Sequence, residues 1–185
     1  MAENTYVIFT ADHGLSIGHH GLVGKQNMYD PSMRVPFLIA GPGIKSGANF
    51  DMPIYLQDAM ATALELASAK KPKQVEFKSV MPLIRGDKMV QYDRIYGKYI
   101  DYQRMIDEGD YKLIMYPRAK VVRLYNMVKD PEEMNDLAKN PEYASVVARL
   151  KADFKVLQKE MGDPLDVDNP PVHKSSKKKP KKKNK

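Results

Sequence analysis

The chain has 185 residues and no cysteine, which excludes disulfides, thiolate metal sites and a cysteine nucleophile within it. Its formal net charge is +7, but the eight lysines of the terminal segment HKSSKKKPKKKNK account for the excess, and without them the net charge is −1. A like-charged run of this kind stays solvated, so the charge does not indicate a basic face on the folded part.

Two short apolar runs lie near the start of the chain, at residues 6–10 and 35–40. Neither run alternates polar with apolar residues, which is typical of parallel strands buried on both faces. The segment 53–71 predicts a helix, because its apolar residues recur at helical spacing. These residues are Leu56, Met60, Ala63, Leu64 and Ala67. The stretch SVMPLIRGD predicts one further turn of helix, closed by Gly86.

From about Arg94 the sequence changes to short runs rich in Tyr, Ile and Val, at 94–100, 111–116 and 121–127. Turn residues separate these runs, so they predict an antiparallel meander. Asp130 followed by Pro131 predicts the start of a helix. A longer helix is predicted from about Pro141, with an apolar stripe that should pack on the meander. The stripe consists of Tyr143, Val146, Val147, Leu150, Phe154, Leu157 and Met161.

The loop between the first two predicted strands carries the candidate metal-binding, anion-binding and proton-transfer residues. Asp12 and His13 follow the end of a strand, where α/β sheets bind their ligands, and they could hold a divalent cation. Lys25 could return to the same place and contact an anionic group. His19 and His20 are candidates for proton transfer or substrate contact. Taken singly, each has an ordinary explanation as a turn, packing or solvated residue, and only the combination indicates a site.

The order TADHG, GHHGLVGK and YDPSMRVPFLIAGPG resembles the C-terminal metal- and sulfate-binding segment of the sulfatase family, within the alkaline phosphatase superfamily. Bacterial choline-sulfatase-like and arylsulfatase-like members are especially similar. The resemblance continues through PIYLQDAMATALELA, SVMPLIRGD, YKLIMY and RLYNMVKDPEEMNDLAKNPEY, and so covers residues 4 to 165. It implies an α/β fold: the C-terminal part of an alkaline-phosphatase-like sheet domain, then a small antiparallel sheet packed on a C-terminal helix.

The resemblance also implies roles for individual residues. Asp12 and His13 would be metal ligands, Lys25 would contact the sulfate group, and the metal would be Ca²⁺. Because calcium prefers oxygen ligands, His13 would either ligate weakly or only hydrogen-bond near the ion. The resemblance gives His19 and His20 no firm catalytic role, so their substrate contact stays a separate expectation.

The family's nucleophile is a formylglycine made from the first residue of a C/S-x-P-S-R motif, and this chain has no such motif. We therefore expect part of a metal-dependent sulfuric ester hydrolase for sugar, aryl or choline sulfates, inactive alone without the N-terminal sulfatase segment. Residues 1–90 would belong to the catalytic domain, 91–168 to the C-terminal subdomain and 169–185 to a disordered lysine-rich tail. The family suggests a periplasmic or secreted location, although MAENTYVIFT is a poor signal peptide.

Three alternatives stay open. The chain could derive from a phosphonate monoester or phosphodiester hydrolase of the same superfamily. It could be a non-catalytic binding module that kept the fold. The tail could bind nucleic acid or anionic lipid nonspecifically through its lysines. Specific nucleic-acid binding is not expected, because no aromatic residue interrupts the tail, and no apolar run is long enough to predict membrane insertion.

Overall fold

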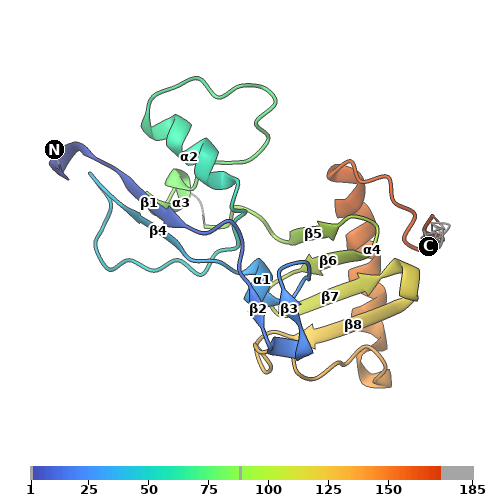
Figure 1. The fold of residues 1–185 in the computed structure, drawn as a ribbon. Coiled ribbons are helices and arrows are strands. Elements are labelled where there is room, and N and C mark those ends of the chain that lie inside the picture. Colours follow the sequence, from blue (N-terminus) through green and yellow to red (C-terminus); the bar gives the residue numbers. More distant parts are fainter. Residues whose placement is uncertain (1, 88, 172–185) are drawn as a thin grey trace, which may run out of the picture.

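The computed structural model describes residues 2–87 and 89–171. An N-terminal part contains two two-stranded ribbons and three short α-helices, and a C-terminal part contains a four-stranded sheet with one long helix (Figure 1). The predicted lysine-rich tail falls, from residue 172 onward, outside the described residues. No helix in the described ranges is long and apolar enough to cross a membrane.

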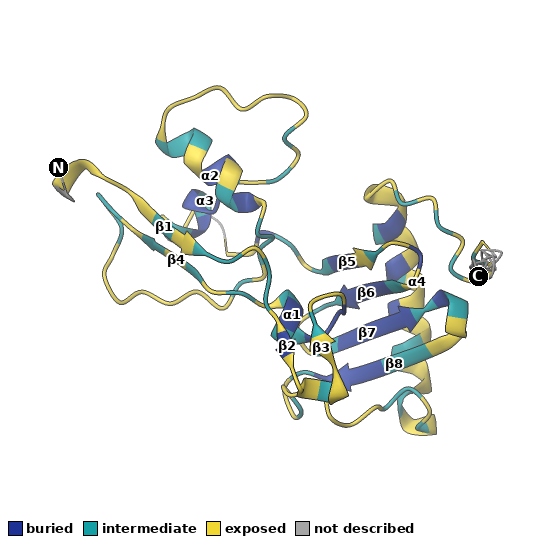
Figure 2. Cartoon of the chain, viewed as in Figure 1, coloured by how far each residue is buried: buried dark blue, intermediate teal, exposed yellow. Residues whose placement is uncertain are grey.

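The N-terminal ribbon consists of β1 (Val7–Thr10) and β4 (Phe37–Ala40), which pair antiparallel along their full length. One face of the ribbon stays open to solvent, with Val7 and Phe9 each 59% exposed and Leu38 62% exposed, while Ile8, Phe37 and Ile39 on the other face are half-buried. The prediction of parallel strands buried on both faces is therefore wrong for this structure. The two strands run antiparallel, and one face of the ribbon is exposed while the other is only partly covered (Figure 2).

The two short helices α2 (Asp58–Leu66) and α3 (Met81–Ile84) are organised around the buried carboxylate of Asp58. This carboxylate accepts four hydrogen bonds: from the backbone N–H groups of Tyr55 (3.0 Å) and Lys78 (3.0 Å), and from the side chains of Gln91 (3.1 Å) and Tyr92 (2.8 Å). The helix predicted over 53–71 is therefore shorter than expected, because its first residues fold around this group. The predicted turn of helix before Gly86 is confirmed.

The predicted meander is confirmed as a sheet of four antiparallel strands in sequential order. Its strands are β5 (Ile95–Tyr99), β6 (Gln103–Asp107), β7 (Tyr111–Tyr116) and β8 (Val121–Asn126). Sequence patterns missed β6, whose arginine and aspartate are typical of a loop. In the structure Arg104 is only 3% exposed, and its Nε lies 2.6 Å from the carboxylate of Asp163, which neutralises the buried charge.

One face of this sheet packs on α4 (Ala144–Glu160), which follows the 3₁₀ turn η4 (Pro141–Tyr143). Alternate residues of the inner strands point to this face and form the main apolar core with the helix. The core contains Ile106, Leu113, Leu124, Leu150 and Phe154, each at most 1% exposed. The predicted helix and its stripe are confirmed except at Met161, which lies beyond the helix and is 38% exposed.

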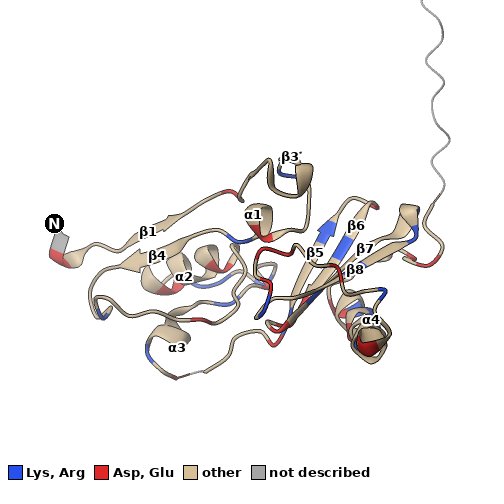
Figure 3. Cartoon of the chain, turned by 90° about the horizontal axis from the view of Figure 1, so that it is seen from below, with Lys and Arg blue, Asp and Glu red and all other residues tan. Residues whose placement is uncertain are grey.

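The opposite face of the sheet carries the loop of residues 11–36. Met105, Ile114 and Tyr125 point to this side and form a second buried cluster with Met28 and Tyr29 of the loop. In the view from below, β3 and α1 of the loop lie on one side of the sheet and α4 on the other (Figure 3). The loop with the predicted site residues is therefore held against the C-terminal sheet.

The helix predicted from Asp130 is wrong. Asp130 does accept hydrogen bonds from the backbone N–H groups of Met134 (3.0 Å) and Asn135 (2.7 Å), but these lie four and five residues on, whereas a capping side chain bonds the second or third residue. Glu133 adopts a positive φ of 56°, which breaks the helical path and turns its side chain inward, where it is 1% exposed. Its ion pair with the buried Lys112, at 2.9 Å, prevails over the local helical preference.

Candidate functional site

The turn after β1 is fixed by a close backbone contact with helix α1 (Asp30–Met33). The N–H of Gly14 donates to the carbonyl of Ser32 at 2.9 Å. A Cβ at Gly14 would lie 2.1 Å from the carbonyl oxygen of Pro31, so only glycine permits this approach. His13 beside it has a φ of 40°, a strained value for a residue with a side chain.

A short hairpin then returns the chain toward this turn. Strands β2 (Ser16–Ile17) and β3 (Val23–Gly24) pair antiparallel, with Ser16 opposite Gly24. Continued by one residue, the same register places Lys25 opposite Leu15, only three residues from Asp12. The hairpin thus turns the chain at Lys25 back in the direction of the segment that follows Asp12, which lies thirteen positions earlier in sequence.

A buried polar network holds the two halves of the loop together. The Ser16 and Ser32 hydroxyls lie 3.1 Å apart, and the side-chain amide of Asn27 donates to the Ser16 hydroxyl at 3.0 Å. The backbone N–H of Tyr29 in turn donates to the Asn27 side-chain oxygen at 3.1 Å. Because Ser16 and Ser32 are at most 1% exposed, water cannot replace these hydrogen bonds, and they hold the loop in its conformation.

A second buried network anchors the loop to the C-terminal sheet. The ammonium group of Lys112 on β7 forms ion pairs with Asp30 of α1 and with Glu133. Glu133 also accepts a hydrogen bond from the backbone N–H of Asp30 at 2.7 Å. Burial works against the charge on Lys112, but the two carboxylates outweigh it and raise the pKa of the lysine. Sequence reasoning missed this network, although a lysine within the apolar run YKLIMY signals a buried charge that needs partners.

Asp12 and His13 are the predicted metal ligands. Asp12 is exposed and has no hydrogen bond or ion pair within residues 2–87 and 89–171. The Nδ1–H of His13 donates to the carbonyl of Gly14 at 2.7 Å, since a carbonyl can only accept. With Nδ1 engaged in this bond, Nε2 is the ring nitrogen left for a metal, as in many histidine metal ligands.

Two donors do not make a calcium site, because Ca²⁺ takes six to eight oxygen ligands. Among the described residues no group of three or more His, Asp or Glu side chains could hold a metal ion. Asp12 and His13 therefore fit a metal only as part of a larger ligand set.

The remaining predicted residues lie apart from one another. Lys25 is exposed, and in the described parts of the chain no hydrogen bond or ion pair joins it to Asp12. His19 is an exposed residue 3.9 Å from the carboxylate of Glu132, and the latter is also exposed. His20 instead packs inward, with its ring stacked on Tyr29 at a centroid distance of 3.9 Å. Burial, with the nearby charges of His19 and Arg123, lowers the pKa of His20, so its ring is neutral at neutral pH.

His20 lines a cavity of about 540 Å³ between the loop and the C-terminal sheet, which we call the loop–sheet cavity. It is bounded by residues of the 3₁₀ turn η2 (His19–Gly21), the segment after β3, and the ends of β6, β7 and β8. These residues are His20, Gln26, Tyr29, Gln103, Tyr116 and Arg123, with four smaller contributors. Sequence reasoning singled out His20 but not its partners on the sheet, which are separated from it by more than eighty positions.

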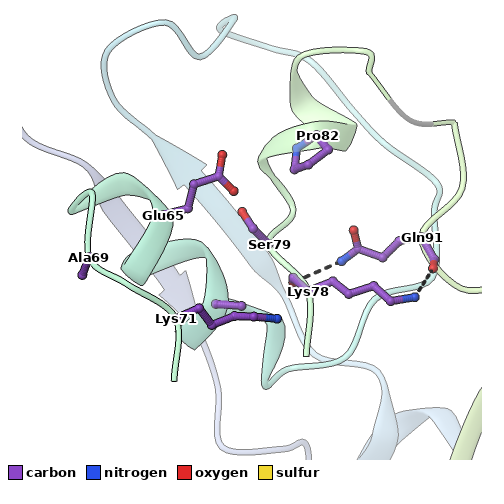
Figure 4. Close-up of a pocket in the computed structure, with 8 residues that line it drawn as sticks. Glu65, Ala69, Lys71, Lys78, Ser79, Pro82 and Gln91 are labelled. Atoms are coloured by element: carbon purple, nitrogen blue, oxygen red, sulfur yellow. Dashed lines mark hydrogen bonds between the residues drawn. The ribbon is translucent and has the colours of Figure 1, made fainter. Parts of the chain in front are cut away.

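A second cavity, of about 420 Å³, lies between α2 and residues 78–91 (Figure 4). Its lysines are already engaged: Lys78 donates to the carbonyl of Gln91 at 3.1 Å, and Lys71 donates to the carbonyl of Phe77 at 2.9 Å. Glu65 on its wall pairs with Arg85 at 2.8 Å. These contacts tie the segment to α2, so the polar groups of this cavity serve the fold.

Known proteins place this arrangement in a family. The family model described as N-sulphoglucosamine sulphohydrolase, C-terminal, matches residues 18–160, which include Lys25, the buried Lys112 network and the whole C-terminal sheet. The chain belongs to the sulfatases. The predicted resemblance is thereby confirmed.

Individual relatives support the same assignment. The chain is 32% identical over 184 residues to a Delta 4,5-hexuronate-2-O-sulfatase of Bacteroides thetaiotaomicron, covering 91% of this sulfatase and 38% of that protein. It is 32% identical over 166 residues to an arylsulfatase of Clostridium perfringens, covering 86% of this chain and 34% of the relative. The chain thus spans little more than a third of the length of the curated relatives it matches.

Solved structures confirm the fold class. A protein solved in complex with its substrate D-glucosamine-2-N,6-O-disulfate superposes with a TM-score of 0.81 and 27% identity, over 90% of this sulfatase and 36% of that chain. A phosphonate monoester hydrolase from Silicibacter pomeroyi gives a TM-score of 0.74 at 21% identity, over 84% of this chain and 35% of that one, and shares the fold alone. The predicted α/β fold, with an antiparallel sheet packed on a C-terminal helix, is that of the C-terminal part of a sulfatase.

Proposed function

We propose that this sulfatase chain supplies the late-sequence half of a sulfate-ester site, with Lys25 contacting the sulfate and Asp12 and His13 contributing to the metal. The observation that carries the proposal is the register of the β2–β3 hairpin. Continued by one residue, this register would bring Lys25 opposite Leu15, on the side of the Asp12–His13 turn that follows β1. The Ser16–Asn27–Ser32 network supports the same geometry, because it holds both arms of the hairpin loop.

Lys25 suits an anionic ester by its charge and its exposure. An ammonium group with three donors and no competing carboxylate can bind sulfate oxygens and stabilise negative charge that develops on them. The long side chain allows the nitrogen to reach across the hairpin toward the Asp12 side. The relatives named above support a sulfated sugar or an aryl sulfate as the substrate class, and sugar, aryl and choline sulfates remain within the proposal.

The metal that we propose is Ca²⁺, which would polarise the ester and hold it in place. Asp12 would supply carboxylate oxygen to the ion, and the Nε2 of His13 would either bind the ion weakly or hydrogen-bond beside it. The other ligands would come from residues outside this set, because two side chains cannot satisfy the ion. Residues 1–90 would then belong to the catalytic domain and 91–168 to the subdomain that holds its loop.

The chemical step requires a nucleophile that these residues do not provide. The chain contains no cysteine and no C/S-x-P-S-R motif from which formylglycine could be made. We therefore propose that these 185 residues alone hydrolyse no sulfate ester. Turnover would need the nucleophile and the remaining metal ligands of a sulfatase N-terminal segment.

Calorimetric titration of the chain with calcium, and then with inorganic sulfate, tests the binding half of the proposal. We expect weak calcium binding that Asp12→Asn abolishes, and weak sulfate binding that Lys25→Met abolishes while leaving calcium binding intact. Lys98→Met, which removes an exposed cation on β5, is the matched control. Sulfate binding that survives Lys25→Met would refute the assignment of Lys25.

A mixture of the chain with a sulfatase N-terminal segment, assayed on 4-nitrophenyl sulfate and on a phenylphosphonate ester, tests the reaction. The sulfatase proposal expects hydrolysis of the sulfate only when both parts are present. Preference for the phosphonate would favour the alternative hydrolase of the superfamily. Failure of any mixture to react, with calcium and sulfate binding absent as well, would favour a non-catalytic module.

A further inference from the structure

The ribbon of β1 and β4 has one apolar face in solvent. Val7 lies opposite Ala40 and Phe9 lies opposite Leu38, so these four side chains share a face of the antiparallel pair. Val7 and Phe9 are each 59% exposed, and Leu38 is 62% exposed. The ribbon extends away from the C-terminal sheet in both Figure 1 and Figure 3, so that sheet does not cover this face.

The β2–β3 hairpin has a second apolar face in solvent. Ile17 and Val23 lie directly opposite each other and are 75% and 90% exposed. Ser16 and Gly24 form the neighbouring pair, and the Ser16 side chain is buried in the hydroxyl network of the loop. The hairpin is therefore fixed by one face and bare on the other. Exposed apolar patches that combine several such pairs usually mark a surface that a partner covers.

The edges of the ribbon are open as well. Within residues 2–87 and 89–171, β1 pairs only with β4, so each of the two strands has one edge without a strand partner. The strand sequences VIFT and FLIA contain no charged residue and no proline. Charged residues and prolines are the usual means by which an edge strand is kept from pairing with another chain. The ribbon is therefore suited to accept a further strand at an edge.

Three occupants could cover these surfaces. The sequence from residue 172 onward contains eight lysines and one large apolar residue, Val172, so it cannot supply an apolar layer. A second copy would cover both faces only if a single two-fold axis served both of them. A longer segment meets no such restriction. The relatives favour this third occupant, because the match to the Bacteroides thetaiotaomicron sulfatase covers only 38% of that protein and the matching family model is described as C-terminal.

We propose that the exposed faces of the β1–β4 ribbon and the β2–β3 hairpin dock the N-terminal segment of a sulfatase, and that a strand of this segment pairs with an edge of the ribbon. The inference rests on the proposed function for the identity of the partner. Because β1 ends two residues before Asp12, a strand added to the ribbon lies next to the Asp12–His13 turn. Docking would therefore bring further side chains to two donors that cannot satisfy a calcium ion by themselves.

The test co-expresses the full 185-residue chain with the part of the Bacteroides thetaiotaomicron sulfatase that lies outside the match, and measures association by co-purification and sedimentation. The matched segment of that relative, used in place of the chain, is the positive control. We expect an equimolar complex. Phe9→Glu and Val23→Glu should each weaken it at least about tenfold, because each places an unpaired carboxylate in the interface. Val156→Glu, at a side chain 58% exposed on α4, is the matched control and should not weaken it.

A fusion of the same two parts gives a second measurement that needs no association step. In the chain alone, Phe9→Glu should leave the melting temperature unchanged, because the side chain is exposed there. In the fusion the partner covers this side chain, so the same variant should lower the melting temperature by several degrees, whereas Val156→Glu should not. The backbone amides of residues 7–10 and 37–40 should also exchange more slowly in the fusion than in the chain alone.

Three results would overturn the inference: association that both glutamate variants leave unchanged, a fusion in which Phe9→Glu has no effect on the melting temperature, or no complex with the chain where the positive control forms one. In the last case, self-association of the chain that Phe9→Glu abolishes would assign the ribbon to a second copy.

The proposed function fails separately. Asp12→Asn should leave the complex intact and abolish its calcium binding. A complex that forms through the ribbon but binds calcium equally well without the Asp12 carboxylate would keep the docking surface and lose the metal assignment.

Discussion

Replacement of Lys112 by methionine should destabilise the chain more than any other single change to a charged residue in the loop–sheet interface. The side chain is 1% exposed and is the only cation that pairs with the fully buried carboxylate of Glu133 within the described residues. Methionine has a similar length and fills the same space, so the change removes charge while packing is largely kept. The carboxylates of Glu133 and Asp30 would then lose their shared partner.

The size of the effect follows from the geometry. Across the 2.9 Å between the Lys112 nitrogen and Glu133, Coulomb attraction at an effective dielectric constant of about 20 is about 6 kcal/mol. Desolvation of both groups offsets part of this attraction, and removal of one partner from a buried pair typically costs about 3–5 kcal/mol. We expect a loss in this range, measured as the free energy of unfolding in urea at neutral pH. Lys98→Met on the same sheet should change it by less than about 0.5 kcal/mol.

The pH dependence of the loss supplies a second signature. Burial already raises the pKa of Glu133 in the folded chain, and Lys112 limits the rise. Without the cation the folded-state pKa rises further, so the folded state is penalised at neutral pH and takes up a proton more readily than the unfolded state as the pH falls. The stability deficit of Lys112→Met should therefore shrink toward pH 4.5, the ordinary value for glutamate.

A double variant separates charge from packing. Lys112→Met combined with Glu133→Gln removes the stranded carboxylate and should recover at least about 1 kcal/mol relative to Lys112→Met alone. A loss below about 1 kcal/mol for the single variant, or a deficit that is constant from neutral pH to pH 4.5, would refute the argument that a buried ion network anchors the loop.

Three further changes test other parts of the structure. Gly14→Ala should cost about 2–3 kcal/mol in thermal or urea unfolding and increase protease cleavage of the loop, because its Cβ would lie 2.1 Å from the Pro31 carbonyl oxygen. Phe154→Ala should cost about 3–5 kcal/mol in urea unfolding, since the ring is 1% exposed in the α4 core. Burial opposes the charge on Asp163, but hydrogen bonds from Arg104 and Tyr96 outweigh it and hold the pKa of this carboxyl well below 3.8. The contribution of Asp163 to the free energy of unfolding is therefore complete above pH 3.8 and is lost as the pH falls below that value. Asp163→Asn should make the stability depend less steeply on pH in this acid range.

Matched controls sharpen these tests. A Cβ at Gly18 would meet nothing within 4 Å, so Gly18→Ala should cost only about 1 kcal/mol, through its φ of 92°. Val156 is 58% exposed on the same helix as Phe154, and Val156→Ala should stay within about 0.5 kcal/mol. Equal losses for Gly14 and Gly18, or for Phe154 and Val156, would contradict the packing described above. An acid limb that Asp163→Asn leaves unchanged would assign the acid sensitivity to another carboxylate.

The amino-acid sequence by itself determined the elements whose signals are local. The apolar residues of α4 recur with a period of 3.6 residues, which predicted both the helix and the face that packs on the sheet, because this period places them all on one side of a helix. The β-branched and aromatic runs predicted three of the four strands of the meander, and the order of motifs in the loop predicted the family. The sequence also predicted that Lys25 returns to the Asp12–His13 turn, which stays a prediction that the hairpin register supports.

Tertiary structure decided everything that depends on partners far away in sequence. Arg104 belongs to a strand because Asp163 neutralises it, and Glu133 leaves a helical path because Lys112 binds it. The exposure of one face of β1 and β4 could not be predicted from the sequence either, since an apolar strand has the same composition whether or not another layer covers it. A buried charge is stable only beside its counter-charge, and its energy is set by a distance that no local pattern encodes. The same is true of the loop–sheet cavity, whose walls meet only when residues 20–29 fold onto residues 103–123.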